Sequence, residues 1–231
     1  MARVTAPEKQ PPATPQTDFG AKVQAHQRYH TKDGKQVPGV TTILGVLNKP
    51  ALVPWANRLG LQGIDTSKYV DEAASVGTLA HAMIAESLGG VKVPHEDFTA
   101  AQLERARHGV TAFEKWRADQ QDFIVCMLEI PLVSETYRFG GTIDCLALIN
   151  GVLELLDLKT SSGVWPEHFY QVSAYWKLLQ ENGQEIKGAR ILRIGRTEGE
   201  GMEEHTLSGR QILNGWHLFE HCLAIYQLKK K

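Results

Sequence analysis

The chain has 231 residues and a mass of 25.7 kDa, enough for one large domain or two small ones with a substantial hydrophobic core. Its 25 Lys and Arg residues against 26 Asp and Glu residues give a formal net charge of -1, which excludes a polycation that binds nucleic acid by bulk charge but not a nucleic-acid enzyme with a local basic groove. Three scattered cysteines exclude a disulfide framework and a four-cysteine metal or iron–sulfur site, and the lack of a long apolar run or a secretory signal pattern leads us to expect a cytoplasmic protein with no membrane span.

The beginning of the chain differs in composition from the rest. Residues 1–20 contain Pro7, Pro11, Pro12 and Pro15 and show no apolar periodicity, which predicts a disordered Pro-rich tail. We expect residues 21–231 to form a single domain. The first feature of that domain is a polar stretch that turns at Asp33-Gly34, a dipeptide typical of hairpins.

A helical region is predicted between about residues 40 and 120. Thr41 is placed to cap a short helix at 42–47, and Pro50 and Pro54 interrupt the chain after it.

Two longer helices follow in this region, at about 66–88 and 100–120. His81 lies on the apolar face of the first of them. Such a histidine, taken alone, is more often a satisfied core residue than a metal ligand.

From about residue 121 the apolar pattern changes to period two, which predicts strands. The expected elements are strands at 123–133, 137–149 and 152–160, a helix at 166–182, strands at 189–196 and 202–207, and a helix at 208–228. Strands and helices in this order predict an α/β fold with a central mixed β-sheet flanked by helices.

The second and third strands are joined by Asn150-Gly151, a strong short-range hairpin signal. A two-residue loop there would place Asp144 directly opposite Asp157, with Cβ atoms about 4.5–5.5 Å apart and Lys159 on the same face. A fold tolerates two facing carboxylates beside leucines if one is protonated or if a cation lies between them. Alternatively, both acids could be solvated beyond the edge of the core, and a bulge would break the register.

Four short motifs then occur in a characteristic order: Gly77-Thr78-x-x-His81, Gly140-Gly141-Thr142-Ile143-Asp144, Glu154-Leu155-Leu156-Asp157-Leu158-Lys159-Thr160-Ser161 and Gln171-x-x-x-Tyr175. Together they resemble the PD-(D/E)XK nuclease superfamily, RecB-like branch, and the segment from Pro38 to Trp55 resembles the N-terminus of phage-type exonucleases of this branch. The resemblance covers roughly residues 28–225. It implies a restriction-endonuclease-like core at about 121–228, with the helical region at 40–120 lying over the cleft.

The resemblance also implies roles for individual residues. His81, Asp144, Asp157 and the backbone carbonyl of Leu158 would bind one or two Mg²⁺ or Mn²⁺ ions, and no iron–sulfur cluster is expected. A histidine ligand makes manganese more acceptable beside magnesium. Lys159 would approach the attacking water or the scissile phosphate, where an ammonium stabilises developing charge.

Further site residues are expected around this centre. Gln171 and Tyr175, four residues apart on one helix face, would lie at the edge of the active site, although ordinary packing would explain Tyr175 equally well. Glu129 could lie near the metal or be an exposed strand residue. Glu154 has the opposite strand parity to Asp157, so we expect it to be exposed and not catalytic.

Candidate DNA contacts are aromatic, hydroxyl and guanidinium side chains around this centre, although solvated arginines are common on any surface. They are Thr41, Trp55, Arg58, Arg138, Thr160, Ser161, Arg193 and Arg196. Two pairs with helical spacing, His26/His30 and His217/His221, are weak candidates for a zinc site.

These features predict a metal-dependent deoxyribonuclease that acts as an exonuclease on DNA ends, prefers single strands and works with phage-type recombination, replication or repair proteins. A structure-selective endonuclease of the same superfamily is one alternative. A DNA-binding accessory protein with a nuclease fold but no turnover is another, although such proteins typically lose an acid or the lysine. RNA as a substrate also stays open.

Overall fold

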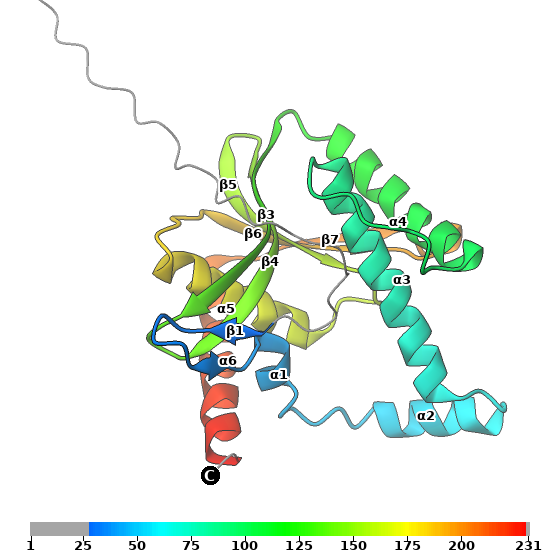
Figure 1. Ribbon diagram of the computed structural model, residues 1–231, viewed down its shortest axis with the longest axis horizontal. Coiled ribbons are helices and arrows are strands. Elements are labelled where there is room, and N and C mark those ends of the chain that lie inside the picture. The colour runs from blue at the N-terminus through cyan, green and yellow to red at the C-terminus, as the bar shows by residue number, and fades with distance from the viewer. Residues whose placement is uncertain (1–27, 230–231) are drawn as a thin grey trace, which may run out of the picture.

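A five-stranded mixed sheet forms the centre of the computed structural model, which describes residues 28–229. The predicted tail at 1–20 and His26 lie outside the described residues. In spatial order the strands are β3 (Phe123–Ser134), β4 (Phe139–Ile149), β5 (Val152–Lys159), β6 (Gly188–Ile194) and β7 (Met202–Thr206). β5 and β6 are parallel and the other neighbours are antiparallel. The predicted α/β class with a central mixed sheet is therefore confirmed (Figure 1).

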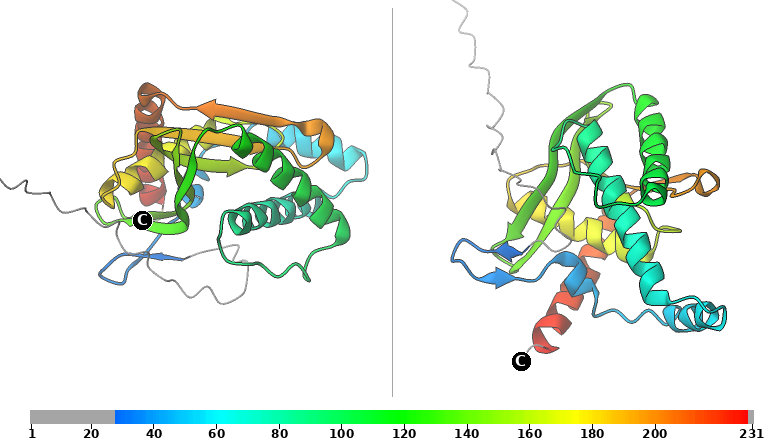
Figure 2. Two further views of the ribbon diagram at one scale, coloured as in Figure 1. Left: turned by 90° about the horizontal axis from the view of Figure 1, so that it is seen from above. Right: turned by 45° about the vertical axis from the view of Figure 1, so that its right-hand side comes forward.

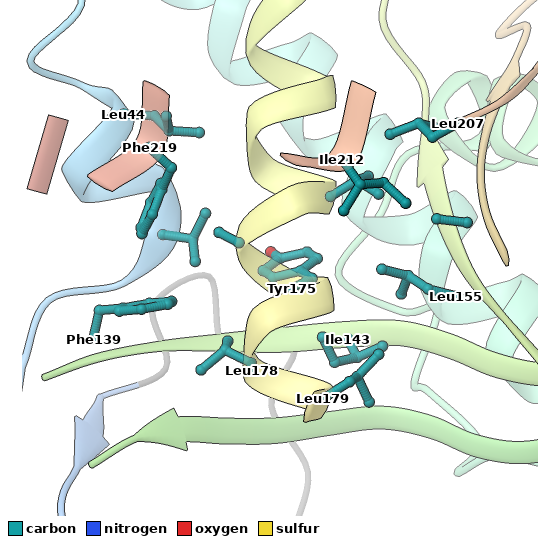
Figure 3. Close-up of a cluster of buried hydrophobic side chains, with 14 of the residues drawn as sticks. Leu44, Phe139, Ile143, Leu155, Tyr175, Leu178, Leu179, Leu207, Ile212 and Phe219 are labelled. Atoms are coloured by element: carbon teal, nitrogen blue, oxygen red, sulfur yellow. The ribbon is translucent and has the colours of Figure 1, made fainter. Parts of the chain in front are cut away.

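Helices cover both faces of this sheet. α3 (Thr66–Ser87) and α4 (Ala100–Ala118) lie on one face, and α5 (Pro166–Glu181) and α6 (Gly209–Lys229) lie on the other (Figures 1 and 2). Each face carries its own cluster of buried apolar side chains, such as Phe113 and Leu156 on the α3/α4 side. The cluster beneath α5 and α6 includes Tyr175, Leu178 and Phe219 (Figure 3).

The N-terminal elements differ in part from expectation. The predicted turn at Asp33-Gly34 joins β1 (Tyr29–His30) to β2 (Gln36–Val37). The prediction that Thr41 caps a helix at 42–47 is wrong, because α1 (Val40–Leu44) begins two residues earlier. Its N-cap is Gly39, and no side chain caps it.

One helix was not expected at all. α2 (Leu52–Leu61) contains Pro54 within its first turn, where the missing N–H has no intrahelical partner in any case. Figure 1 shows α2 at the far end of α3 from the sheet. No helix among the described residues combines the length and the apolar character that a bilayer crossing requires.

The β4–β5 hairpin has the predicted register from Ile149↔Val152 to Cys145↔Leu156. Glu154, which we expected to be exposed, is buried instead. Its carboxylate lies 2.5 Å from Nε of Arg190 on the neighbouring parallel strand β6, and this ion pair compensates the burial of its charge. Strand parity alone predicted the wrong environment here, since both faces of β5 are covered by helices.

Candidate metal centre

Three side chains from three different elements meet beside β4. One ligand atom each of His81 on α3, Glu129 on β3 and Asp144 on β4 lies within 4.8 Å of the other two. His81 Nδ1 is 3.7 Å from Asp144 Oδ2. The three residues line a small pocket whose remaining wall is largely apolar, formed by Ile84, Ala85, Leu88, Leu128, Cys145 and Leu158. Two carboxylates and an imidazole in such a pocket are a donor set that could hold a divalent metal ion.

The position of Glu129 follows from the β3–β4 ladder. Leu128 pairs with Cys145 and Ile130 pairs with Ile143, so Glu129 and Asp144 lie at the same level of the sheet. A register shift between Val125 and Met127 and a positive φ of 47° at Glu129 accompany this arrangement. A bulge re-aims side chains in this way, and here it brings the glutamate to the aspartate.

A glycine allows α3 to approach the sheet closely enough for His81 to join the group. A Cβ placed on Gly77 would lie 2.5 Å from Oγ1 of Thr160, just beyond β5. Only a residue without a side chain fits between the helix and this threonine. Gly77 and His81 are four residues apart, so they lie on the same helix face and reach β5 and β4 respectively.

Burial and mutual repulsion perturb the titration of the two carboxyls. Burial, with a further contribution from the Asp144 charge, raises the pKa of Glu129 to about 7. Burial also acts on Asp144, but His81, Lys159 and the Leu158 amide favour its charged form and lower its pKa. The pKa of His81 is raised, because Asp144 outweighs the effect of burial. The site therefore holds excess negative charge that a proton or a cation would neutralise.

Asp157 lies next to this group without belonging to it. Regular β4–β5 pairing ends at Cys145↔Leu156, one step before the predicted Asp144–Asp157 pair. Asp144 Oδ2 instead accepts a hydrogen bond of 2.8 Å from the Leu158 amide. Asp157 is 1% exposed, and neither of its oxygens accepts a regular hydrogen bond from the described residues.

The partner of Asp157 is the lysine two residues later. Lys159 Nζ lies 2.5 Å from Asp157 Oδ2 and donates to the Leu158 carbonyl at 3.2 Å. Burial raises the pKa of Asp157 to about 6, with Lys159 opposing that rise and Asp144 adding to it. Thus the structure brings His81, Asp144, Asp157, Leu158 and Lys159 into one neighbourhood, while Glu129 takes the place next to Asp144 that was expected for Asp157.

Gln171 and Tyr175 form a hydrogen-bonded pair on α5. Gln171 Nε2 donates to the Tyr175 hydroxyl at 2.8 Å. Tyr175 packs against the sheet at Gly141, where a Cβ would lie 2.5 Å from its ring. Burial raises the pKa of this phenol well above its usual value, and the charges of Asp157 and Asp144 add to the rise. Tyr175 is therefore a neutral group whose hydroxyl is oriented by Gln171.

The candidate DNA contacts are scattered, and several are already engaged. Arg138 donates two hydrogen bonds to Asp33, at 3.1 and 3.0 Å. Arg193 and Arg196 are buried and pair with Glu203 and Glu200. This placement does not favour phosphate contacts for the three arginines.

The other candidates differ in their surroundings. Ser161 Oγ donates to the Gly163 carbonyl at 2.7 Å, and Thr160 lies against α3. Thr41 and Arg58 are exposed, and Trp55 is half-buried. His217 and His221 lie on α6, on the opposite side of the sheet from α3.

Comparison with known proteins gives only distant similarity. No protein-family model matches the chain, and no curated protein matches it either. A candidate exonuclease from Eubacterium rectale has a similar structure with a TM-score of 0.47 and 15% identity over 65% of this chain. The chain covers 64% of the length of that protein. LHK-Exo, crystallised with dAMP, has a TM-score of 0.36 and 14% identity over 68% of this chain and 86% of its own. We therefore base the function on the side chains of the site.

Proposed function

We propose that this chain is a metal-dependent deoxyribonuclease of the PD-(D/E)XK superfamily, RecB-like branch, acting as an exonuclease on DNA ends. The observation that carries the proposal is the convergence of His81, Glu129 and Asp144 beside the Asp157–Lys159 pair. Each of these residues except Glu129 lies in a motif of that branch. A buried group with this much negative charge and this donor chemistry fits a divalent cation.

His81, Glu129 and Asp144 would hold Mg²⁺ or Mn²⁺, with Asp157 and the Leu158 carbonyl next to them. A bound ion of this kind polarises a phosphoryl oxygen and lowers the pKa of a water molecule. The Leu158 amide fixes one oxygen of Asp144 and leaves the rest of that carboxylate available as a ligand.

Lys159 is the group most suited to act on the substrate. Its ammonium is held by Asp157 and the Leu158 carbonyl, in a half-buried position where it can orient the attacking water and stabilise charge on the phosphate. Gln171 is half-buried on α5 and can contact the DNA backbone, while the buried Tyr175 would orient its amide. Single-strand preference and a role in phage-type recombination, replication or repair complete the proposal.

The test is a cleavage assay with Mg²⁺ or Mn²⁺ on linear and circular DNA, each single- and double-stranded. We expect linear single strands to be shortened from their ends and closed circles to survive. Asp157→Asn and Lys159→Met should fold and bind DNA but lose cleavage, while Glu185→Gln, at an exposed site, should cut like the wild type. Efficient cutting of a closed circle would favour the endonuclease, and binding without any cleavage would favour an accessory protein.

A further inference from the structure

The turn between β5 and α5 presents a large aromatic side chain to solvent. Trp165 is 51% exposed and follows Lys159 by six residues. Tryptophan is usually well buried, and an indole this open has a face that a ligand can reach. Neither the metal centre nor the proposed chemistry gives this residue a role.

The backbone around Trp165 is fixed on both sides. Its N–H donates to His168 Nδ1 at 3.2 Å, and the indole lies near Gly163, where a Cβ would be 3.7 Å from the ring. Ser161 closes the turn through its bond of 2.7 Å to the Gly163 carbonyl. Burial, with the nearby Lys159 and Lys49, lowers the pKa of His168 to about 4, so its Nδ1 stays available as an acceptor at neutral pH. A backbone held this way fixes the point from which the indole projects, so less backbone freedom is lost when a flat ligand stacks on the ring.

Two lysines, each also paired with a carboxylate, flank this turn. Lys159 and Lys49 are both close enough to His168 to act on its titration, and Lys49 lies 3.4 Å from Glu167 at the start of α5. An aromatic face beside cations is the combination by which proteins hold single-stranded nucleic acid, with bases stacked on the ring and phosphates near the ammonium groups. A base can stack on a side chain in this way only when it has left the duplex.

We infer that Trp165 is a base-stacking platform that holds an unpaired nucleotide next to Lys159, which makes a single strand or a frayed end the substrate. This inference rests on the proposed nuclease function for its place in the reaction. The stacking itself is a binding property, so it can be tested without turnover.

The experiment measures binding by fluorescence anisotropy in EDTA, so that no strand is cut. Its two probes are a labelled oligo(dT) of about 16 nucleotides and an abasic strand of equal length, which keeps the phosphates but lacks the bases. For Trp165→Ala we expect the Kd for oligo(dT) to rise roughly 5- to 150-fold, with no comparable rise for the abasic strand. Trp165→Phe keeps a π face, so its Kd for oligo(dT) should rise less than that of Trp165→Ala. Leu228→Ala, which truncates a 69% exposed side chain at the end of α6, is the matched control and should bind both probes like the wild type.

Three results would overturn the inference: an unchanged Kd for oligo(dT) in Trp165→Ala, an equal loss on the abasic strand, or no binding of either probe by the wild type. The last would leave the indole as a contact for another protein. A wild type that binds oligo(dT) through Trp165 but cuts no DNA would refute the nuclease and keep the platform. A nuclease whose Trp165→Ala variant binds and cuts like the wild type would refute the stacking platform and keep the nuclease.

Discussion

Removal of the Glu129 charge should stabilise the metal-free protein at alkaline pH. The pKa of this carboxyl rises from 4.5 to about 7 on folding, so the folded state binds the proton more tightly than the unfolded chain does. The stabilisation of the folded state by protonation of Glu129 is fully present below pH 4.5 and is lost as the pH rises through 7. The shift corresponds to about 3 kcal/mol at 1.36 kcal/mol per pKa unit, and partial exposure reduces this to about 1–3 kcal/mol.

Glu129→Gln mimics the protonated carboxyl at every pH. In EDTA at pH 8 we expect this variant to be more stable than the wild type by about 1–3 kcal/mol, whereas at pH 4 the two should be nearly equal. Groups far from the site are common to both proteins and cancel in the difference, whereas Asp144 and His81 interact with the Glu129 charge and contribute to it. Urea unfolding at several pH values measures it, with Glu185→Gln as the control for a change at an exposed site.

Mn²⁺ should reverse the order of stabilities. The ion binds the folded site and stabilises the wild type at pH 8, but it should stabilise Glu129→Gln far less because one ligand charge is missing. A stability difference between variant and wild type that does not change with pH would refute the electrostatic reasoning. Equal stabilisation of both proteins by Mn²⁺ would remove Glu129 from the metal centre.

Two further predictions concern packing around the site. Gly77→Ala would place a methyl group 2.5 Å from Thr160 Oγ1, so we expect a loss of about 1–3 kcal/mol in urea unfolding and weaker Mn²⁺ binding. Adding Thr160→Ala to Gly77→Ala should restore much of the stability and of the Mn²⁺ affinity. If the two substitutions show no coupling in a double-mutant cycle, the contact between residues 77 and 160 is contradicted. Glu154→Ala should lower the free energy of unfolding by about 2–3 kcal/mol, since among residues 28–229 Arg190 would then keep Glu204 alone as a carboxylate partner. An unchanged urea midpoint would show that the buried pair is energetically neutral.

The β4–β5 hairpin was predictable because its turn is short. Asn150 and Gly151 both have positive φ, of 50° and 82°, as the type of turn expected from an Asn-Gly pair requires. Counting residues outward from this turn therefore gave the correct β4–β5 register as far as the pair Cys145↔Leu156. Counting failed beyond that pair because the Asp144 side chain takes the Leu158 amide as its partner. No sequence pattern predicts that a side chain replaces a backbone partner in the β4–β5 hydrogen-bond ladder.

Glu129 could be named from the sequence but not placed. Its level opposite Asp144 depends on a longer turn after β3 and on a register shift between Val125 and Met127, and both are set by tertiary packing. Similarly, α2 was missed because Pro54 was interpreted as an interruption, although proline is compatible with a first turn. In both cases the outcome depended on where the residue lies within its element: Glu129 beyond a bulge in β3, and Pro54 in the first turn of α2.

The near-zero net charge acquires a physical explanation from the ion pairs. Arginines that could have formed a basic surface are instead paired with carboxylates within the fold: Arg138 with Asp33, Arg190 with Glu154 and Glu204, Arg193 with Glu203, and Arg196 with Glu200. Charge used in this way contributes little to the long-range attraction of DNA. A strand would then be held by short-range contacts near the end of β5, where a metal ion, Lys159 and an exposed indole act together. Affinity built from stacking and metal binding should depend less on salt than affinity built from many phosphate contacts.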